Sequence, residues 1–560
     1  MSVSKNIARL AVTAGLTAAL SFGGVMAPVT MAFAAGTNGS VTITNVEGND
    51  TEFKGYQIFK ADVAADGTVS NITWANPNVK MAVEAVIQAG DESYEGTTAQ
   101  DAADWITKNV TGTNVATRVP SDSAAYKIAD AVDNLTETVT TTKRQASNLA
   151  HGYWLFVTDT STIRDGEAGS SPIFAAVGNN PLIIEEKTGI PTVEKKIVSD
   201  ADGKECDAAD SQIGQDVTYN LYGTVAENFD KYGTYFYQFS DQISKGLTLQ
   251  SGAKVYLYTS KDTAKNDLTR ANGTDITSYF KQNDGEADAN GNKTTTWTCD
   301  DLKKVDSVNK DSCIVVSYKA QINKDAVVAG TAGNENTVTL YYSNNPMSTE
   351  KGKTQPDTVK DYTYGLKINK VDLGTEAAIK GAKFTIQATR ADDGASTNLY
   401  VQPDGTLGTD ANEFETDEKG AITVTGLDAG TYTVTETSAP SGYTTVKPFT
   451  FEIKPTMSPN DPDADLAKLS GMLETSEGDK VIAGLTDGKS GDNKLEAAAN
   501  STTNDDGTLN ITVGDTKQVG LPLTGLNGVT FTWIAGGAVL AIGVAHLIRS
   551  RKQAEESEQE

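Results

Sequence analysis

The chain has 560 residues, enough for three domains of ordinary size, and a formal net charge of −27 at pH 7. This acidity argues against nucleic acid as a partner, because phosphate binding needs clustered lysine and arginine side chains. The chain has only two histidines, so zinc sites with several histidines are excluded, and we expect no metal and no cofactor.

The N-terminus has the layout of a secretory signal peptide. A basic start precedes an apolar run from Leu10 to about Met26, and Ala32-Phe33-Ala34 offers a cleavage site between small residues. We therefore assign residues 1–34 to the signal peptide and expect an exported protein.

Residues 35–188 are predicted to form a mixed, mostly β, N-terminal domain. It opens with a strand pair, continues with helix-like patches and closes with three strands. The expected strands are 41–43, 56–59, 153–157, 172–177 and 182–184, and the expected helices are 80–88, 99–108 and 124–135.

A Gly-Ile-Pro turn signal then begins a second domain, residues 189–360. Its strands alternate polar and apolar residues and are separated by turn clusters, which is typical of an immunoglobulin-like β-sandwich. They are expected at 217–222, 254–258, 314–318 and 337–342.

All three cysteines fall in this second domain, and two would normally pair in an exported protein. Cys299 and Cys313 flank a polar loop and are the easier pair to join, whereas Cys206 is more distant in sequence. The sequence leaves the pairing open.

The third domain, residues 361–518, is also predicted to be a β-sandwich. A polar insertion at about 456–508 interrupts it. Its strands are expected at 366–372, 381–386, 430–436 and 510–515.

Each of the two later domains places a lysine on the inward face of its first strand. Side chains two apart share a face of a strand, so Lys195 lies with Ile197 and Lys370 lies with Ile368. A lysine in a sandwich core is costly unless it has a partner. Later in each domain, strand alternation also places polar side chains on the inward face. These are Asn336 in the second domain and Glu436 and Asp515 in the third.

Residues 432–443 read YTVTETSAPSGY, which matches the pilin E-box YxLxETxAPxGY with valine at the leucine position. Together with Lys370-Val371-Asp372 and Gly381-Ala382-x-Phe384, this region resembles the collagen-adhesin B-type domain of a sortase-assembled pilin. The second domain is similar to the partner A-type module, with Asp241 in FSDQISKGL. The whole chain thus resembles the major, or backbone, subunit of a Gram-positive pilus.

The resemblance implies spontaneous isopeptide bonds, Lys370–Asp515 promoted by Glu436 and Lys195–Asn336 promoted by Asp241. Burial explains the chemistry, because desolvation favours a neutral amine that can attack a carbonyl carbon and a protonated acid that can polarise it. Contact between the groups supplies proximity.

Several alternatives remain open. Position 515 is aspartate where such domains more often carry asparagine, so a buried ion cluster without a bond is one alternative. In the second domain Asn334 and Asn344 compete as acceptors. Lys196 is a weaker alternative to Lys195, because strand alternation places its side chain on the outward face.

Residues 519–560 resemble a sorting signal. An LPxTG-type pentapeptide precedes the uncharged stretch 529–548, which is long enough to span a bilayer, and a basic tail follows. The resemblance implies sortase cleavage between Thr524 and Gly525, whereas a plain tail anchor is the alternative. The pentapeptide consists of Leu521, Pro522, Leu523, Thr524 and Gly525.

Pilins of this family carry a polymerisation lysine near the junction of the first two domains, often as Tyr-Pro-Lys. Lys187 has this position without the Tyr-Pro pair. The resemblance therefore implies a non-enzymatic shaft subunit, joined by a sortase through Thr524 to Lys187 of the next copy and anchored to peptidoglycan outside the cell.

Accessory pilins and host surface or matrix ligands are further candidate partners. A monomeric wall-anchored adhesin, or a basal or tip pilin, would have the same folds. A wall-anchored hydrolase is a third hypothesis, but no pair of carboxylates stands out for it among the many acids.

Overall fold

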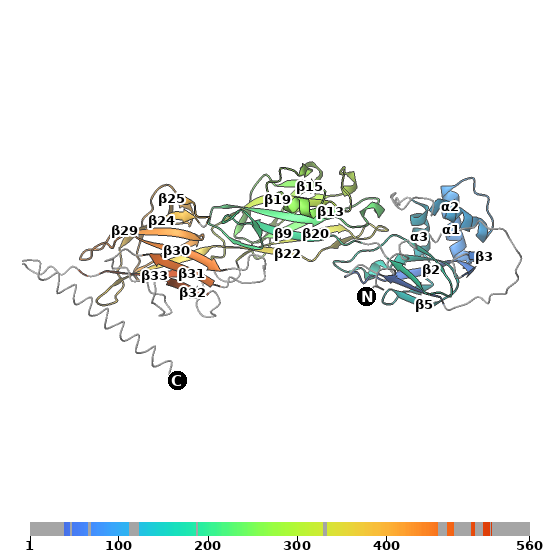
Figure 1. Cartoon of the computed structure of the whole chain (residues 1–560), viewed down its shortest axis with the longest axis horizontal. Coiled ribbons are helices and arrows are strands. Elements are labelled where there is room, and N and C mark those ends of the chain that lie inside the picture. Colours follow the sequence, from blue (N-terminus) through green and yellow to red (C-terminus); the bar gives the residue numbers. More distant parts are fainter. Residues whose placement is uncertain are drawn as a thin grey trace, which may run out of the picture.

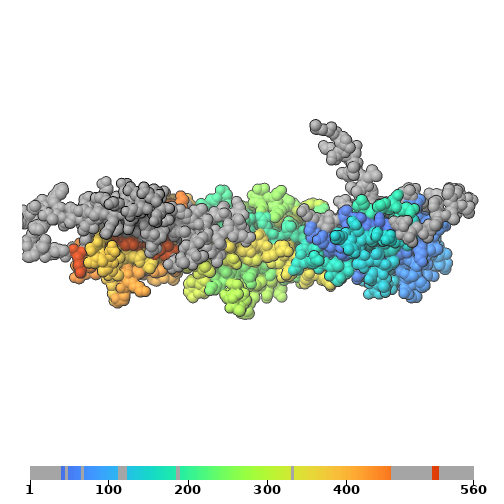
Figure 2. Space-filling model, turned by 90° about the horizontal axis from the view of Figure 1, so that it is seen from below, coloured from blue at the N-terminus to red at the C-terminus, as the bar shows by residue number. Residues whose placement is uncertain are grey.

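The computed structural model describes residues 39–44, 48–64, 69–110, 123–185, 189–328, 333–391, 393–456, 468–474, 494–498, 508–515 and 517. Three domains follow one another along the long axis of the molecule (Figure 1), and the view from below shows the same linear order (Figure 2). Within the described ranges, no helix is long and apolar enough to cross a membrane. The predicted signal peptide, the stretch 529–548 and Leu521–Gly525 lie outside these ranges.

The first domain has two sheets and three helices, which is the mixture of strands and helices expected from the sequence. One sheet has the order β3-β2-β6-β7 with β4 beside β2, and the other has the order β5-β1-β8. The strands are β1 (Gly39–Thr44), β2 (Phe53–Val63), β3 (Val69–Trp74), β4 (Val139–Thr140), β5 (Gln145–Leu149), β6 (Gly152–Thr158), β7 (Ile173–Val177) and β8 (Leu182–Glu185). The helices are α1 (Pro77–Gly90), α2 (Ala99–Val110) and α3 (Ala124–Asp133).

The expected pairing of the first two strands is wrong, because β1 and β2 belong to different sheets. β1 pairs with β5 and, in parallel, with β8. Strand β6, whose residues are all buried, shows why: Trp154 packs toward the β1 sheet, whereas Leu155 packs toward the helices. The central sheet of this domain is therefore covered on both faces.

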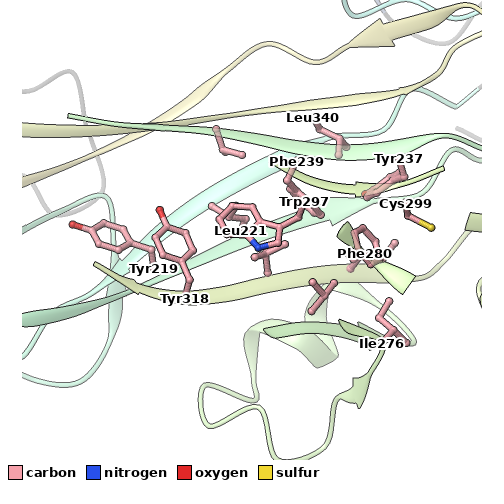
Figure 3. Close-up of a cluster of buried hydrophobic side chains, with 14 of the residues drawn as sticks. Tyr219, Leu221, Tyr237, Phe239, Ile276, Phe280, Trp297, Cys299, Tyr318 and Leu340 are labelled. Atoms are coloured by element: carbon pink, nitrogen blue, oxygen red, sulfur yellow. The ribbon is translucent and has the colours of Figure 1, made fainter. Parts of the chain in front are cut away.

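The second domain is a sandwich of two seven-stranded sheets. The first sheet has the order β10-β9-β12-β19-β15-β16 with β14 beside β19, and the second has the order β11-β22-β20-β13-β18-β17 with β21 beside β20. Aromatic side chains fill the space between the sheets (Figure 3).

The strands of the first sheet are β9 (Val193–Val198), β10 (Glu205–Cys206), β12 (Asp216–Thr224), β14 (Leu247–Leu249), β15 (Lys254–Tyr258), β16 (Thr274–Asp275) and β19 (Cys313–Ile322). The strands of the second are β11 (Ala208–Asp210), β13 (Tyr237–Ile243), β17 (Lys281–Ala287), β18 (Lys293–Cys299), β20 (Asn334–Ser343), β21 (Lys351–Lys353) and β22 (Asp357–Tyr362).

The candidate disulfide between Cys299 and Cys313 is not formed, and all three cysteines are free and buried. Cys299 ends β18 and faces the core between the sheets (Figure 3). Cys313 begins β19, and its side chain lies on the opposite face of that sheet, beside Tyr222 and Tyr258. The two thiols therefore belong to different layers, and burial raises the pKa of Cys313 to about 12.

The third domain has a small sheet, β28-β23-β33, and a large sheet, β26-β25-β24-β29-β30-β31-β32, with β27 beside β24. The first and last strands, β23 and β33, are parallel neighbours. The strands are β23 (Tyr364–Asp372), β24 (Lys383–Ala391), β25 (Ser396–Val401), β26 (Leu407–Gly408), β27 (Phe414–Glu415), β28 (Ala421–Leu427), β29 (Gly430–Ser438), β30 (Phe449–Thr456), β31 (Lys468–Glu474), β32 (Lys494–Ala498) and β33 (Thr508–Asp515).

The polar insertion at about 456–508 contributes structure that its composition does not predict. Its strands β31 and β32 pair with each other, and β31 pairs with β30. The insertion therefore widens the large sheet.

The second and third domains are joined by a short link, since only Thr363 separates β22 from β23. Next to this link, the buried Gln212 side chain donates hydrogen bonds to the carbonyl oxygens of Gly405 and Gly426. Gly426 has a φ of +88°, and a Cβ there would overlap Ile213. The closely fitted backbone predicts a junction with little freedom to bend.

Replacing Gln212 with alanine is expected to lower the free energy of unfolding of the third domain by about 1–3 kcal/mol, because the buried Gly405 carbonyl oxygen loses its side-chain donor and Gly426 O keeps only the Ile213 N–H. Urea denaturation of the two-domain unit, followed by hydrogen exchange at residues 426–428, measures the effect. Gln250→Ala is the matched control, since the Gln250 amide bonds only to Thr248 O at the surface. Equal effects of the two substitutions would contradict a special role for Gln212.

Candidate crosslink sites

The first candidate site lies between the two sheets of the second domain. Lys195 comes from β9 in one sheet, whereas Asp241 and Asn336 come from β13 and β20 in the other. All three residues are almost fully excluded from solvent. Strand alternation puts Lys195 on the same face as the buried Ile197, so its side chain must cross the core.

The lysine amine meets both predicted partners. Its Nζ is 2.5 Å from Asn336 Oδ1, and it forms an ion pair with Asp241. The Asn336 carbonyl group is therefore placed directly against the amine, and the carboxyl group of Asp241 lies on the same nitrogen. This arrangement puts a nucleophile, an acceptor and an acid in contact.

Burial changes the protonation of the Lys195 amine. Desolvation lowers its pKa from 10.5 to about 8, even though the charge of Asp241 acts in the opposite direction. At pH 7 about a tenth of the amine is therefore neutral, and this is the form that can attack a carbonyl carbon.

The alternative residues of this domain lie elsewhere. Lys196 points away from the core and forms an ion pair with Asp207 at 2.6 Å. Asn334 bonds through its amide to the backbone of Val327 and Asp361. Among the described contacts of Lys195, Asn336 is thus the asparagine within reach.

The second candidate site lies in the third domain and again spans two sheets. Lys370 is on β23 and Asp515 is on the neighbouring β33, whereas Glu436 is on β29 in the large sheet. Lys370 Nζ is 2.9 Å from Glu436 Oε2 and 3.0 Å from Asp515 Oδ2. The three side chains have no exposed surface.

The register of the parallel strands explains this meeting. Lys370 is aligned with Val513, and Asp515 lies two residues further along β33 on the same face. The amine therefore reaches one step along the neighbouring strand to the Asp515 carboxyl group.

Glu436 is held in place by the backbone. Its Oε2 accepts a hydrogen bond from the N–H of Val446 at 2.8 Å. Burial is the largest influence on this carboxyl group and raises its pKa, although the Val446 N–H and Lys370 act in the opposite direction. A raised pKa favours the protonated acid that the crosslinking chemistry requires.

The alternation of inward and outward side chains along a strand does not identify two further groups that contact the site residues. Tyr318 on β19 contacts Lys195 through its hydroxyl group at 3.0 Å, and the Val446 N–H orients Glu436. Tyr318 shares the inward face of its strand with Val316, so strand alternation predicts that it is buried. The alternation does not show which polar group Tyr318 contacts across the core.

Lys187 and the pentapeptide from Leu521 to Gly525 lie outside the described residues, so their predicted roles stay predictions. Strand β8 ends at Glu185, two residues before Lys187, and β33 ends at Asp515, a few residues before the pentapeptide.

Comparison with known proteins gives one family match. Residues 364–462, which contain Lys370 and Glu436, match the family model SpaA, described as a prealbumin-like fold domain. This segment covers most of the third domain.

One curated relative is the trypsin-resistant surface T6 protein of Streptococcus pyogenes serotype M6, which is 27% identical over 278 residues. The match includes 46% of this chain and 44% of the relative, so the chain spans less than half of the length of that protein.

Similar solved structures include the T6 backbone pilin of serotype M6 Streptococcus pyogenes, with 17% identity and a TM-score of 0.49 over 86% of this chain and 98% of that one. The major pilin SpaD from Corynebacterium diphtheriae has 19% identity and a TM-score of 0.43, again over 86% and 98%. The family match and the sequence relative confirm the expected resemblance to Gram-positive backbone pilins, and residues 364–462 form a prealbumin-like SpaA domain.

Proposed function

We propose that the chain is the shaft subunit of a covalent surface pilus and that its second and third domains crosslink themselves. The observation that carries the proposal is the pair of buried clusters, each with a lysine, an acid and a carbonyl acceptor in contact. A single buried lysine could be an accident of packing. Two such clusters, each with its lysine on the strand that opens its sandwich, support a common chemistry in the two domains.

In each domain the lysine nitrogen attacks the side-chain carbonyl carbon and an amide bond forms. Ammonia leaves from Asn336 and water leaves from Asp515. Asp241 and Glu436 are the promoting acids. The protein catalyses only this reaction on itself, and it is otherwise structural and a substrate of a sortase.

The positions of the bonds suit a molecule under tension. Lys195 lies near the start of its domain and Asn336 near its end, and Lys370 and Asp515 have the same relation. Force that enters and leaves through the domain ends would pass across the two bonds. The intervening strands would then carry little of it.

The first domain provides a contrast that supports Lys187 as the linkage lysine. No lysine in its described part is buried, so it has no equivalent cluster. If the preceding subunit is joined at Lys187, force enters between the first two domains and bypasses the first. The clusters then occur only in domains that lie between Lys187 and Thr524.

The proposed partners follow from this role. A sortase joins Thr524 to Lys187 of another copy, the last copy is attached to peptidoglycan, and accessory pilins share the fibre. The protein is then extracellular. A monomeric wall-anchored adhesin or a basal or tip pilin is the alternative, because it would use the same domains without polymerisation.

The intact mass of residues 36–520 is expected to fall by about 17 Da for Lys195–Asn336 and about 18 Da for Lys370–Asp515. Lys195→Ala removes the first loss and Lys370→Ala the second, and Glu436→Ala leaves only the first. Each bond closes a loop of about 140 residues, which corresponds to about 4–5 kcal/mol in the chain-entropy model. An unshifted parent mass would leave only buried ion clusters.

Crosslinking of the second domain is expected to accelerate as the pH rises toward 8 and to level off above it. The folded-state pKa of Lys195 is lowered to about 8, so the reactive neutral amine becomes dominant only above that pH. Freshly synthesised chain is held at about pH 6 and transferred to higher pH, and the 17 Da loss is followed by mass spectrometry. A rate that does not change between about pH 6 and 9 would contradict this dependence.

Wall extracts are expected to contain a high-mass ladder that collapses to monomer in Lys187→Ala, because the amine that receives Thr524 is removed. Lys60→Ala, which changes an exposed lysine of the same domain, is the control and should keep the ladder. Immunoblotting of wall extracts measures both. Monomer alone in the parent strain would favour the wall-anchored adhesin instead.

A further inference from the structure

Tyr318 occupies the centre of the second-domain site in a fixed orientation. Its ring is buried and stacked between Tyr219 and Trp297, with ring centroids 5.4 and 5.3 Å away. Figure 3 shows the three side chains side by side in the core. The stacking leaves the ring little freedom, so the hydroxyl group is held at one point between the sheets.

The Tyr318 hydroxyl group contacts every group that would take part in the reaction. It accepts hydrogen bonds from Lys195 Nζ at 3.0 Å and from Asn336 Nδ2 at 2.7 Å. It also donates a hydrogen bond to Asp241 Oδ2. The oxygen therefore bridges the nucleophilic nitrogen and the nitrogen that would leave.

We propose that Tyr318 is a catalytic residue of the second-domain crosslink and that its hydroxyl group carries a proton from Lys195 Nζ to Asn336 Nδ2. The inference rests on the Lys195–Asn336 bond proposed above. It assigns the tyrosine a chemical role that neither Lys195 nor Asp241 can fill from its own position.

The step starts from the neutral Lys195 amine, the form that becomes dominant as the pH rises past the lowered pKa of Lys195. The amine lone pair then attacks Asn336 Cγ. The Tyr318 oxygen takes one proton from Nζ while its own proton, turned away from Asp241, passes to Nδ2. The Cγ–Nδ2 bond breaks, ammonia leaves, and the tyrosine hydroxyl group is restored.

The step needs a proton donor at Nδ2, because an amide nitrogen leaves readily only after protonation. Lys195 bonds to the oxygen of the Asn336 amide, and Asp241 bonds to Lys195 and Tyr318. Among the described hydrogen bonds, that of Asn336 Nδ2 goes to the Tyr318 oxygen. Burial raises the Tyr318 pKa well above its ordinary value. The hydroxyl group therefore stays protonated and gives up its proton only as it receives another.

The third domain provides an internal control. Lys370 Nζ has its described polar contacts with the carboxyl groups of Glu436 and Asp515, and this site lies in a different domain from Tyr318. A change at position 318 should therefore leave the Lys370–Asp515 reaction unchanged within the same molecule.

The test follows both mass losses over time in residues 36–520 made by cell-free synthesis. In Tyr318→Phe the 17 Da loss is expected to be about a hundredfold slower than in the parent, whereas the 18 Da loss keeps its rate. Tyr237→Phe is the matched control, because it removes another buried hydroxyl group of the same core, one that bonds to Thr224 O. Its 17 Da loss should keep the parent rate.

A second measurement covers the case in which Tyr318→Phe does not fold. Incorporation of 3,5-difluorotyrosine at position 318 keeps the ring and the hydroxyl group but makes the hydroxyl group more acidic. The rate of the 17 Da loss should then change by at least about threefold if the group carries the proton.

The outcomes separate the two proposals. A parent chain without the 17 Da loss would overturn the Lys195–Asn336 bond itself. A parent that crosslinks, together with unchanged rates in Tyr318→Phe or in the fluorinated chain, would overturn the role of Tyr318 and leave the bond intact.

Discussion

The burial of two lysine amines in β-sandwich cores is the constraint on which much of this molecule depends. An ammonium group without partners in such a core would cost several kcal/mol, so each amine must have its acids and acceptor in place before the sheets can close. Lys195 and Lys370 therefore fix which strands may face each other. The same requirement brings the atoms of the proposed bonds into contact, so folding would itself prepare the proposed chemistry.

The two sites meet this constraint with different topologies. Lys370 and Asp515 lie on neighbouring parallel strands of one sheet, and Glu436 approaches from the other sheet. Lys195 and Asn336 lie on opposite sheets, and Asp241 stands on β13, the neighbour of the acceptor strand. One bond would thus tie strands within a sheet and the other would tie the two sheets together. Both bring the start and the end of their domain close to one point.

Strand parity predicted these sites because burial in a sandwich follows a period of two residues, which is visible in a single sequence. The same rule does not reveal strand partners, so it predicts neither the separation of β1 from β2 nor the strands of the polar insertion. Cys299 and Cys313 were close in sequence, but they stand on different layers. Contacts across a core, such as that of Tyr318, depend on sheet stacking, which local sequence does not encode.

The junctions between domains determine how far the second and third domains can bend relative to each other. A bond inside each domain cannot stiffen the connection between them, yet Gln212 and the single-residue link at Thr363 make that connection short and closely packed. The first domain also meets the second through backbone hydrogen bonds, from Gly166 to Lys353 and from Gly169 to Asn344. Asn344 directly follows β20, the strand that carries Asn336. This one stretch of chain therefore connects the candidate site of the second domain with the contact to the first domain. The stiffness of the proposed fibre would thus come from non-covalent packing at the junctions, whereas its resistance to extension would come from the crosslinks.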